Sequence, residues 1–326
     1  MTKIRWGILS TANIAQKALI PAIGRAENAE VVAIGSGNPN VKEVAEKFNI
    51  PTVYNSYDAL LDDPNLDAVY IPLPNHLHKE WVMKAAQKGK HVLSEKPAAL
   101  NAEETKELVE ACKKHGMKYM EAFMYQFHGQ HKRVKEIIAS GEIGDVQLMK
   151  SSFSFFMANP EGNIRMDPKM GGGSIYDIGC YCIHSIRHIL DDEPEEIYVE
   201  ADMHPEYNID NSAYGIFKMK SGVRAMFDCS FTMPFRTAYE VIGSEGVIKV
   251  PRAFRPDKND HEGLIVIEKE DNVREEIVVT DQYKTQVEHL SNAILENKDP
   301  IYSGEDTIKN MKIIDACYES IKQNTK

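Results

Sequence analysis

The segment Ile4-Arg5-Trp6-Gly7-Ile8-Leu9-Ser10-Thr11-Ala12-Asn13-Ile14-Ala15 decides the expected fold of this chain of 326 residues. It joins a short apolar run, Ile4–Leu9, to a helical run, Ile14–Ala26, through a turn of small residues. In a doubly wound α/β sheet, glycines in this turn let the backbone approach a pyrophosphate at the N-terminus of the helix. Serine and alanine replace all three glycines of G-x-G-x-x-G here. The substitutes are small enough for close approach, with a plain strand-to-helix turn as the alternative.

The same alternation of strand-like and helical runs continues through the first third of the chain. The further runs are Val31–Gly35, Val41–Phe48, Ala68–Ile71, His76–Lys88, His91–Ser94, Ala102–His115 and Tyr119–Ala122. Buried strands that alternate with amphipathic helices indicate a parallel sheet covered on both faces, because parallel strands need crossover helices. We therefore expect an α/β protein whose residues 1–123 form a Rossmann domain, a doubly wound parallel sheet that binds NAD(P).

The rhythm changes after about Tyr125. A helix, Gly129–Ser140, is followed by a strand, Val146–Phe156, a glycine-rich loop, another helix and several strand-like segments up to Val279. Successive strands without intervening helices predict an α+β domain with an open, largely antiparallel sheet over residues 124–326. The last two helical stretches, Gln286–Glu296 and Glu305–Lys322, can pack on either domain.

Composition limits the classes of function. Hydrophobic residues make up 43% of the chain and charged residues 27%, and no apolar run reaches the length of a membrane-spanning helix. A net charge of −11 argues against a nucleic-acid partner, which requires clustered Lys and Arg. The five scattered cysteines fit neither a disulfide framework nor a metal knuckle. Since Met1–Ser10 does not resemble a signal peptide, we expect a cytoplasmic protein with a small-molecule partner.

The end of the second strand bears on the choice of cofactor. An acidic residue there accepts a ribose hydroxyl of NAD and repels the 2′-phosphate of NADP. The sequence Gly35-Ser36-Gly37-Asn38 holds no carboxylate, which favours NADP over NAD. The arginine that would grip the phosphate is also missing, so Ser36, Asn38 and Lys42 are the available contacts. The alternative is a simple turn at Asn38-Pro39.

Two more strand ends carry residues suited to a ligand site: the segments Pro72–His78 and Glu95-Lys96-Pro97. Ligands of open α/β sheets bind outside the carboxyl ends of the strands. Pro97 restricts the backbone of Lys96 to extended conformations, and the bond between them could be cis. The alternative is that Lys96 is one solvated lysine among many.

The most informative stretch is Gly171–Cys182, in which three glycines precede a helix that we expect to begin at an N-cap, Ser174, and to reach about Leu190. One face of this helix carries a polar column, formed by Asp177, Tyr181, His184 and His188. A carboxylate and a phenol in such a column can transfer a proton to or from an alcohol.

Each member of this column also has a structural interpretation. Asp177 could complete a capping box with Ser174, Tyr181 could be a packing residue, and the histidines could be solvated. A zinc site on His184 and His188 is conceivable, but no third ligand cluster is visible, so we expect no metal.

Taken together, the motifs resemble the Gfo/Idh/MocA family of oxidoreductases along the whole chain. They are Trp6–Ala15, Pro74–His78, Glu95-Lys96-Pro97, Glu121–Tyr125, Gly171–Tyr181 and Ile242–Gly246. The three glycines and Tyr181 are similar to the branch of dihydrodiol dehydrogenases, NADP-dependent xylose dehydrogenases and glucose-fructose oxidoreductase. The chain departs from this branch in the lost glycine pattern and at Gly37, where NADP-using relatives often have arginine.

This resemblance implies a catalytic pair of Lys96 and Tyr181, a supporting Asp177, and a dimer or dimer of dimers formed through the open sheet. Tyr125 and Phe156 complete the expected substrate residues, with Lys169 as a further pocket residue. The expected cofactor residues are Ser10, Thr11, Ala12, Asn13, Ile14, Ser36, Gly37, Asn38, Lys42, Pro72, Leu73, Asn75, His78, Glu95, Lys96 and Arg165.

The expected activity is hydride transfer between NADP, or NAD, and the hydroxyl or carbonyl of a sugar, polyol or trans-dihydrodiol, with Tyr181 as proton acceptor. Two alternatives remain open at the level of sequence. The first is an NAD-dependent glycoside hydrolase, and the second is a non-catalytic nucleotide sensor on the same scaffold.

Overall fold

The computed structural model describes residues 2–324, which form two compact units. Of these, residues 2–124 and 283–311 form unit 1, and residues 125–282 and 312–324 form unit 2. The chain passes from unit 1 to unit 2 between Met124 and Tyr125, one residue beyond the expected boundary. The segment Tyr283–Met311 returns to unit 1, which is one of the two placements left open for the last two helical stretches.

Contacts within unit 1 explain this return. Trp6 Nε1 donates to Ser291 Oγ at 3.3 Å, and Asn28 Nδ2 donates to the carbonyl of Glu288 at 2.9 Å. The indole of Trp6 is fully buried, so its N–H needs a partner inside the protein.

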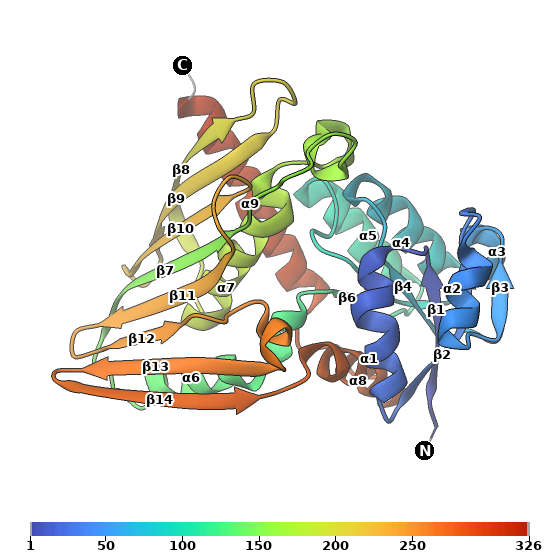
Figure 1. The fold of residues 1–326 in the computed structure, drawn as a ribbon, viewed down its shortest axis with the longest axis horizontal. Helices are drawn as coiled ribbons and strands as arrows, with labels where there is room; N and C mark the ends of the chain where they lie inside the picture. The colour runs from blue at the N-terminus through green and yellow to red at the C-terminus, as the bar shows by residue number, and fades with distance from the viewer. Residues whose placement is uncertain (1, 325–326) are drawn as a thin grey trace. The chain divides into compact units, whose positions relative to one another are not determined.

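Unit 1 is built on a six-stranded parallel sheet of order β3-β2-β1-β4-β5-β6. Its strands are β1 (Ile4–Leu9), β2 (Ala29–Gly35), β3 (Thr52–Tyr54), β4 (Ala68–Ile71), β5 (His91–Ser94) and β6 (Tyr119–Glu121). The order reverses between β1 and β4, and helices cover both faces (Figure 1). This arrangement confirms the predicted doubly wound sheet.

The helices of unit 1 follow the strands, as crossover connections require. They are a π-helical turn η1 (Ala15–Leu19), α1 (Ile20–Arg25), α2 (Val41–Phe48), α3 (Tyr57–Leu61), a 3₁₀ turn η2 (Asn75–Leu77), α4 (His78–Gln87), α5 (Ala102–Lys114), α8 (Gln282–Leu295) and the first part of α9 (Gly304–Asn324). The short pair β3 and α3 was not anticipated from the sequence.

Unit 2 is built on an eight-stranded sheet of order β14-β13-β12-β11-β7-β10-β9-β8. Its strands are β7 (Val146–Ser154), β8 (Pro194–Met203), β9 (Asp210–Met219), β10 (Arg224–Ser230), β11 (Arg236–Gly243), β12 (Val247–Val250), β13 (Glu262–Lys269) and β14 (Asn272–Val279). Only β10 and β7 pair in parallel among the named strands, so the sheet is largely antiparallel, as predicted.

One face of this sheet carries the helices of unit 2. They are η3 (Met124–Phe127), α6 (Gly129–Ala139), η4 (Ile164–Met166), η5 (Pro168–Met170), the π-helical turn η6 (Ile175–Gly179), α7 (Cys180–Leu190), η7 (Pro256–Asn259) and the last part of α9. Strand β10 shows the division, since Ala225 and Phe227 are buried while Met226 between them is exposed. The opposite face of the sheet is open.

Among the described residues, no helix is long and apolar enough to cross a membrane. All five cysteines are buried and unpaired with one another.

Candidate active site

The turn after β1 adopts a conformation that glycine normally supplies. Ser10 has φ 113°, although it carries a side chain. Its N–H donates to the carbonyl of Gly35 at 2.8 Å, and its Oγ accepts from the N–H of Ala12 at 3.0 Å. Such backbone strain costs about 1–3 kcal/mol and is common at ligand sites. The helix begins right after the turn, at Asn13, so its N-terminal N–H groups fit a dinucleotide phosphate without the three glycines.

A polar network joins this turn to the end of β2. Asn38 Nδ2 donates to Thr11 Oγ1 at 3.2 Å, and Thr11 Oγ1 in turn donates to Asn40 Oδ1 at 3.1 Å. Ser36 is buried, and its Oγ accepts from the N–H of Asn38 at 3.1 Å. Three of the predicted cofactor residues therefore lie together, and the network contains no carboxylate.

Gly37 and Lys42 complete the predicted residues at the end of β2. A Cβ added to Gly37 would lie 3.9 Å from its nearest neighbour, the carbonyl oxygen of Asn55, so a larger side chain has room there. Lys42 is exposed in the first turn of α2.

His78 holds together the loops that follow β4 and β5. Its ring is fully buried, with Nδ1 2.8 Å from the carbonyl oxygen of Pro97 and Nε2 2.8 Å from that of Leu73. Burial lowers the pKa of His78 to about 4, so the ring is neutral and its single N–H bonds one carbonyl at a time. Any effect of His78 on a cofactor therefore passes through the two loops.

Glu95 anchors the loop that carries Lys96. The Lys96-Pro97 bond is cis. Glu95 Oε1 accepts from the hydroxyl of Tyr70 at 2.5 Å, and Glu95 Oε2 accepts from the N–H of Lys96 at 3.4 Å. Lys96 itself is partly exposed at the carboxyl end of β5, as the motif predicted.

Glu121, at the end of β6, is buried beside the Lys96 loop, a placement that sequence reasoning did not predict. Its carboxyl group is buried and accepts from the N–H of Ala98 and, at 3.3 Å, from the hydroxyl of Tyr302. Burial raises its pKa to about 8, while the positive charge of Lys96 opposes that rise. The Glu121-Ala122 motif was visible in the sequence, but nothing there showed that the side chain points toward the Lys96 loop.

In unit 2, Asp177 and Tyr181 lie on the helix expected from the sequence, and Arg165 of η4 contacts Asp177. Arg165 Nε donates to Asp177 Oδ2 at 2.6 Å. The charge of Asp177 raises the pKa of Arg165, and Tyr181 adds to that effect. Arg165 was expected to contact the cofactor, and the structure adds this ion pair. The three side chains form one polar group at the start of the helix.

The start of this helix differs from the expected one. Ser174 has a helical backbone and makes no N-cap bond. Its Oγ donates to Asp210 Oδ2 at 2.8 Å, and the same oxygen accepts from the N–H of Ile175 at 2.7 Å. The prediction of Ser174 as N-cap was therefore wrong, because the carboxylate of Asp210, 36 residues after Ser174, takes that place. The side chain of Asp177 pairs with Arg165 instead of closing a capping box.

Aromatic rings surround Tyr181, of which 6% is exposed. Its ring centroid lies 5.9 Å from that of Tyr125, 5.4 Å from Phe153 and 5.6 Å from Phe254. Such a setting fixes the direction of the phenol ring.

The predicted substrate residue Tyr125 is fully buried, and its hydroxyl lies 2.5 Å from His184 Nδ1. His184 is buried too, and burial lowers its pKa well below the ordinary value, so the interpretation of His184 as a solvated histidine was wrong. Burial also lowers the pKa of His188 to about 4. The ring of Tyr125 packs against the ring of Tyr181.

The remaining predicted pocket residues lie at the surface of unit 2. Phe156 is 68% exposed and Lys169 is exposed. Within residues 2–324, no group of three His, Cys, Asp or Glu side chains is placed to hold a metal ion.

Comparison with known proteins identifies the family. Residues 4–123 match the oxidoreductase family with an NAD-binding Rossmann fold, and residues 131–249 match the GFO/IDH/MocA C-terminal domain. The chain belongs to the GFO/IDH/MocA oxidoreductase family. This confirms the resemblance found in the sequence motifs.

Individual relatives are similar over much or nearly all of their length. D-xylose 1-dehydrogenase (NADP(+)) 2 of Haloferax volcanii is 37% identical, over 97% of this chain and 96% of the relative. Trans-1,2-dihydrobenzene-1,2-diol dehydrogenase of Mus musculus is 31% identical, over 78% and 76%. The structure of KijD10, a 3-ketoreductase from Actinomadura kijaniata in complex with NADP and TDP-benzene, superposes with a TM-score of 0.92 at 29% identity, over 98% of both chains.

Proposed function

We propose that this family member is an NADP-dependent dehydrogenase or reductase that acts on a hydroxyl or carbonyl group of a small sugar, polyol or trans-dihydrodiol. The observation that carries the proposal is the Arg165, Asp177 and Tyr181 group of unit 2 in a chain that also keeps Lys96 at a strand end of unit 1. The xylose and dihydrodiol dehydrogenases among the relatives support the substrate class.

In the proposed mechanism, the positive charge of Lys96 favours the phenolate form of Tyr181, which accepts the proton of the substrate hydroxyl as the hydride leaves and becomes the neutral phenol. Asp177, held by Arg165, accepts a hydrogen bond from a second substrate hydroxyl and so orients the reacting carbon. The nicotinamide, when bound, supplies the hydride acceptor. The Ser10–Ile14 turn would hold the pyrophosphate, and the loops Pro72–Asn75 and Glu95–Lys96 would border the nicotinamide end.

The preference for NADP is supported by the end of β2. Neutral Ser36 and Asn38 stand where a carboxylate would repel the 2′-phosphate, and Lys42 is exposed nearby. The xylose dehydrogenase relative carries NADP(+) in its name, and KijD10 was solved with NADP.

The direct test follows nicotinamide absorbance with NADP and NAD against D-xylose, D-glucose, inositols and trans-dihydrodiols. We expect reduction of NADP with at least one aldose or diol, and a higher kcat/KM with NADP than with NAD. Failure of every substrate in both reaction directions, in protein that binds NADPH, would contradict the proposed activity.

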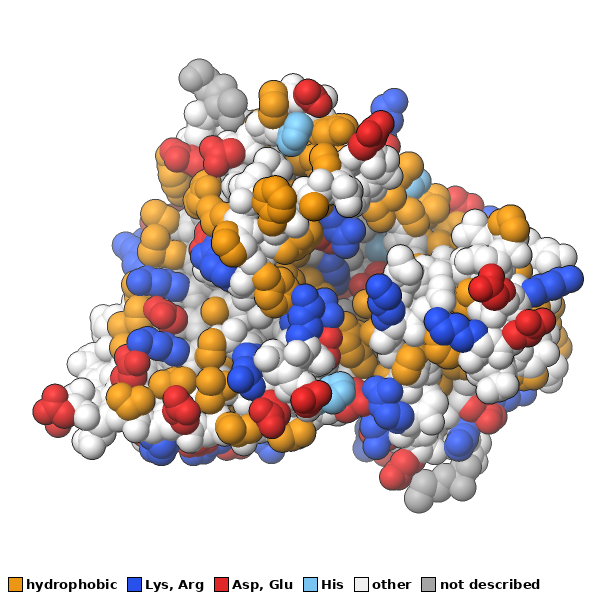
Figure 2. Space-filling view, in the orientation of Figure 1, with side chains coloured by type: hydrophobic (Ala, Val, Ile, Leu, Met, Phe, Trp, Pro, Cys, Tyr) orange, Lys and Arg blue, Asp and Glu red, His pale blue; other side chains and the backbone are white. Residues whose placement is uncertain are grey.

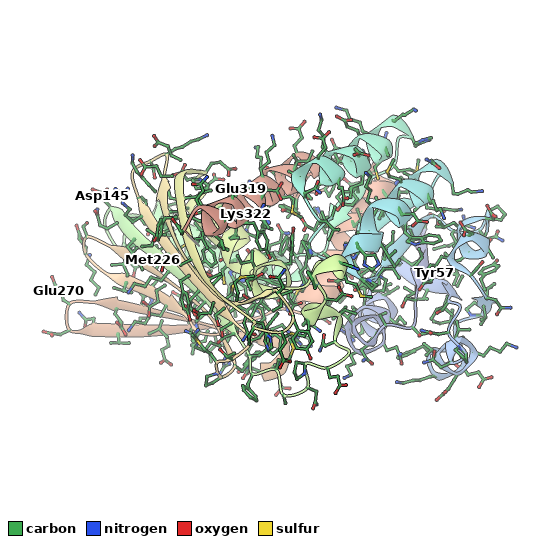
Figure 3. All side chains as sticks on the ribbon, turned by 90° about the horizontal axis from the view of Figure 1, so that it is seen from above. Tyr57, Asp145, Met226, Glu270, Glu319 and Lys322 are labelled. Atoms are coloured by element: carbon green, nitrogen blue, oxygen red, sulfur yellow. The ribbon has the colours of Figure 1, made fainter. Side chains whose placement is uncertain are left out.

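We further propose that the open face of the unit 2 sheet binds a second copy of the chain. A groove of about 460 Å³ on this face is lined by apolar and charged side chains, among them Ile216 and Met226. Figure 2 shows hydrophobic side chains between charged ones over these strands, and Figure 3 shows Met226 on the sheet and Glu319 and Lys322 on α9. An exposed apolar patch of this kind is typical of an interface.

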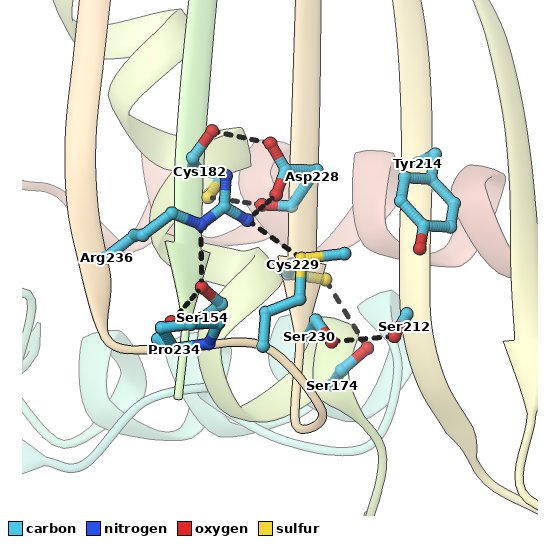
Figure 4. A network of polar contacts seen from close by, with 12 residues as sticks. Ser154, Ser174, Cys182, Ser212, Tyr214, Asp228, Cys229, Ser230, Pro234 and Arg236 are labelled. Atoms are coloured by element: carbon cyan, nitrogen blue, oxygen red, sulfur yellow. Dashed lines mark hydrogen bonds and ion pairs between the residues drawn. The ribbon is translucent and has the colours of Figure 1, made fainter. Parts of the chain in front are cut away.

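The polar part of this face is already ordered. Arg236 pairs with Asp228, which accepts from Ser152 Oγ at 2.5 Å, and Arg236 Nε donates to Ser154 Oγ at 2.9 Å (Figure 4). We expect light scattering to give twice the mass of one chain, and Ile216→Lys to give a monomer. Ile301→Lys, at an exposed isoleucine of unit 1, is the matched control. The unpaired cysteines are typical of a reducing compartment and support a cytoplasmic location.

A further inference from the structure

Asp210, the first residue of β9, gathers donors from three parts of unit 2. The side chain is 2% exposed. Its Oδ2 accepts from Ser174 Oγ and from the N–H of Ile175, at 2.8 and 2.7 Å, and its Oδ1 accepts from the hydroxyl of Tyr318 on α9 at 2.9 Å. Burial raises the pKa of Asp210 to about 6, so the group is a carboxylate at neutral pH. A buried anion with three donors is fixed in position.

The glycine-rich loop is shaped around this carboxylate. Gly173 has φ 118°, and a Cβ added to it would lie 2.1 Å from Asp210 Oδ1. The N–H of Gly173 donates to the carbonyl of Arg165 at 2.9 Å. The third glycine of the motif is therefore required by Asp210, and it ties the backbone of Arg165 to the same point.

The helix that carries the proposed reacting groups starts at this point. Ile175 is the first residue of η6, and Asp177 lies two residues later, paired with Arg165. Tyr181 follows four residues after Asp177, on the same helical column. The sulfur of Cys229 also donates to Ser174 Oγ at 3.4 Å, which fastens the same turn to β10 (Figure 4). A carboxylate at the N-terminus of a helix also complements the helix dipole.

We propose that Asp210 is a positioning residue for the reaction proposed above: by holding the N–H of Ile175, the hydroxyl of Ser174 and the loop at Gly173, it sets where Asp177, Arg165 and Tyr181 meet the substrate. This inference rests on the proposed function. Asp210 touches neither substrate nor cofactor in this role. It acts through the first turn of the helix, and a small displacement of such groups is costly, since a misplacement of about 1 Å can cost about 100-fold in rate.

The experiment compares Asp210→Ala, Asp210→Asn and Tyr318→Phe in the full-length protein. Turnover is measured on the substrate found in the panel and divided by the concentration of NADPH-binding sites from a fluorescence titration, so unfolded molecules are not counted. We expect Asp210→Ala to lower kcat at least about tenfold, with the NADPH Kd changed less than about twofold, because all the expected cofactor residues except Arg165 belong to unit 1.

The two other variants separate positioning from stability. Asp210→Asn keeps an oxygen for Ser174 and Ile175, so it should restore most of the kcat lost in Asp210→Ala. Tyr318→Phe removes only the donor to Oδ1, so it should lower the melting temperature while kcat stays within about twofold of wild type.

Two results would overturn the inference. One is an Asp210→Ala protein with wild-type kcat per NADPH site, and the other is an Asp210→Asn protein as slow as Asp210→Ala. Tyr181→Phe is run beside them. A wild-type protein that turns over no substrate of the panel contradicts the proposed function, and a normal Tyr181→Phe removes Tyr181 from the mechanism. A slow Tyr181→Phe with a fast Asp210→Ala contradicts only the role of Asp210.

Discussion

The two units hold their reactive side chains by different means. In unit 1, the functional groups lie in turns at the carboxyl ends of parallel strands. These turns are held through their backbone carbonyls, as the ring of His78 shows between Leu73 and Pro97. In unit 2, the functional groups lie on one helix, and a carboxylate from a distant strand, Asp210, fastens its start. The topology of the sheet therefore determines the site in unit 1, whereas individual side-chain contacts determine it in unit 2.

Removing the reactive group of either unit should have the largest effect. Tyr181→Phe deletes the proposed proton acceptor, and Lys96→Met deletes the charge that stabilises it. We expect each to lower kcat by about 10² to 10⁴, the usual contribution of general acid-base catalysis. Stopped-flow or steady-state absorbance of NADPH measures this loss.

NADPH fluorescence titration of both variants is the control. Tyr181 belongs to unit 2, so Tyr181→Phe should bind NADPH as wild type does. Lys96 lies in an expected cofactor-binding loop, so Lys96→Met can change both kcat and the NADPH Kd. Turnover of Tyr181→Phe within about threefold of wild type would remove the tyrosine from the mechanism.

A smaller effect should follow from loosening the unit 1 loops. His78→Phe keeps a buried ring but removes the single N–H that bonds the carbonyl of either Leu73 or Pro97. We expect the NADPH Kd to rise about tenfold, since an unsatisfied buried acceptor costs about 1–3 kcal/mol. His115→Gln, at an exposed histidine of the same unit, is the matched control. An unchanged Kd in His78→Phe would show that the loops keep their positions without the ring.

Lowering the pH should destabilise unit 2 more than unit 1. Burial lowers the pKa of four histidines in unit 2 (His128, His131, His184 and His188) and of three in unit 1 (His78, His91 and His289). Below about pH 6.5 these histidines bind protons in the unfolded chain but stay neutral in the folded protein. The free energy of unfolding therefore falls as the pH drops toward about 4. The raised pKa values of Asp210 in unit 2 and Glu121 in unit 1 act in the opposite direction, by one proton each. Unit 2 should therefore lose more stability.

The two tryptophans make this difference measurable, because Trp6 and Trp81 both belong to unit 1. Far-UV circular dichroism reports both units. Between pH 6.5 and 4 we expect the dichroism signal to change before tryptophan fluorescence does, with a loss on the order of 1 kcal/mol per pH unit for each proton taken up. Coincident transitions would mean that the units unfold as one.

The sequence predicted unit 1 well because its signals are local. Each apolar run such as His91–Ser94 ends in a turn, and the topology of a parallel sheet then brings those turns to one edge. The exceptions are β3 and α3, Thr52–Tyr54 and Tyr57–Leu61, which are too short to show a periodicity. Glu121 was visible as part of a motif, but its burial beside the Lys96 loop depends on Ala98 and Tyr302, far away in the sequence.

Unit 2 contains contacts that a local sequence pattern did not predict. The helix, its glycines and the column from Asp177 to His188 were predicted, but the cap was assigned to Ser174 because Asp210 lies 36 residues away from it. The same limit applies to Tyr125, which was expected to contact the substrate and whose hydroxyl is bonded to His184. Pairings between distant segments are not encoded in a local pattern.

The smallest effect should come from Ser10, where unit 1 itself departs from a purely topological site. The backbone of Ser10 is strained at φ 113°, and the hydrogen bond from the N–H of Ala12 to its Oγ offsets part of the cost in stability. Ser10→Ala keeps the strain and loses the bond, so we expect it to destabilise the protein by about 1 kcal/mol and to weaken NADPH binding slightly. Ser10→Gly loses the same bond but removes the strain, so its melting temperature and NADPH Kd should lie close to wild type. Differential scanning calorimetry and fluorescence titration compare the two variants. If Ser10→Gly is as unstable as Ser10→Ala, the hydroxyl matters more than the backbone, and side-chain contacts would then also determine the unit 1 site.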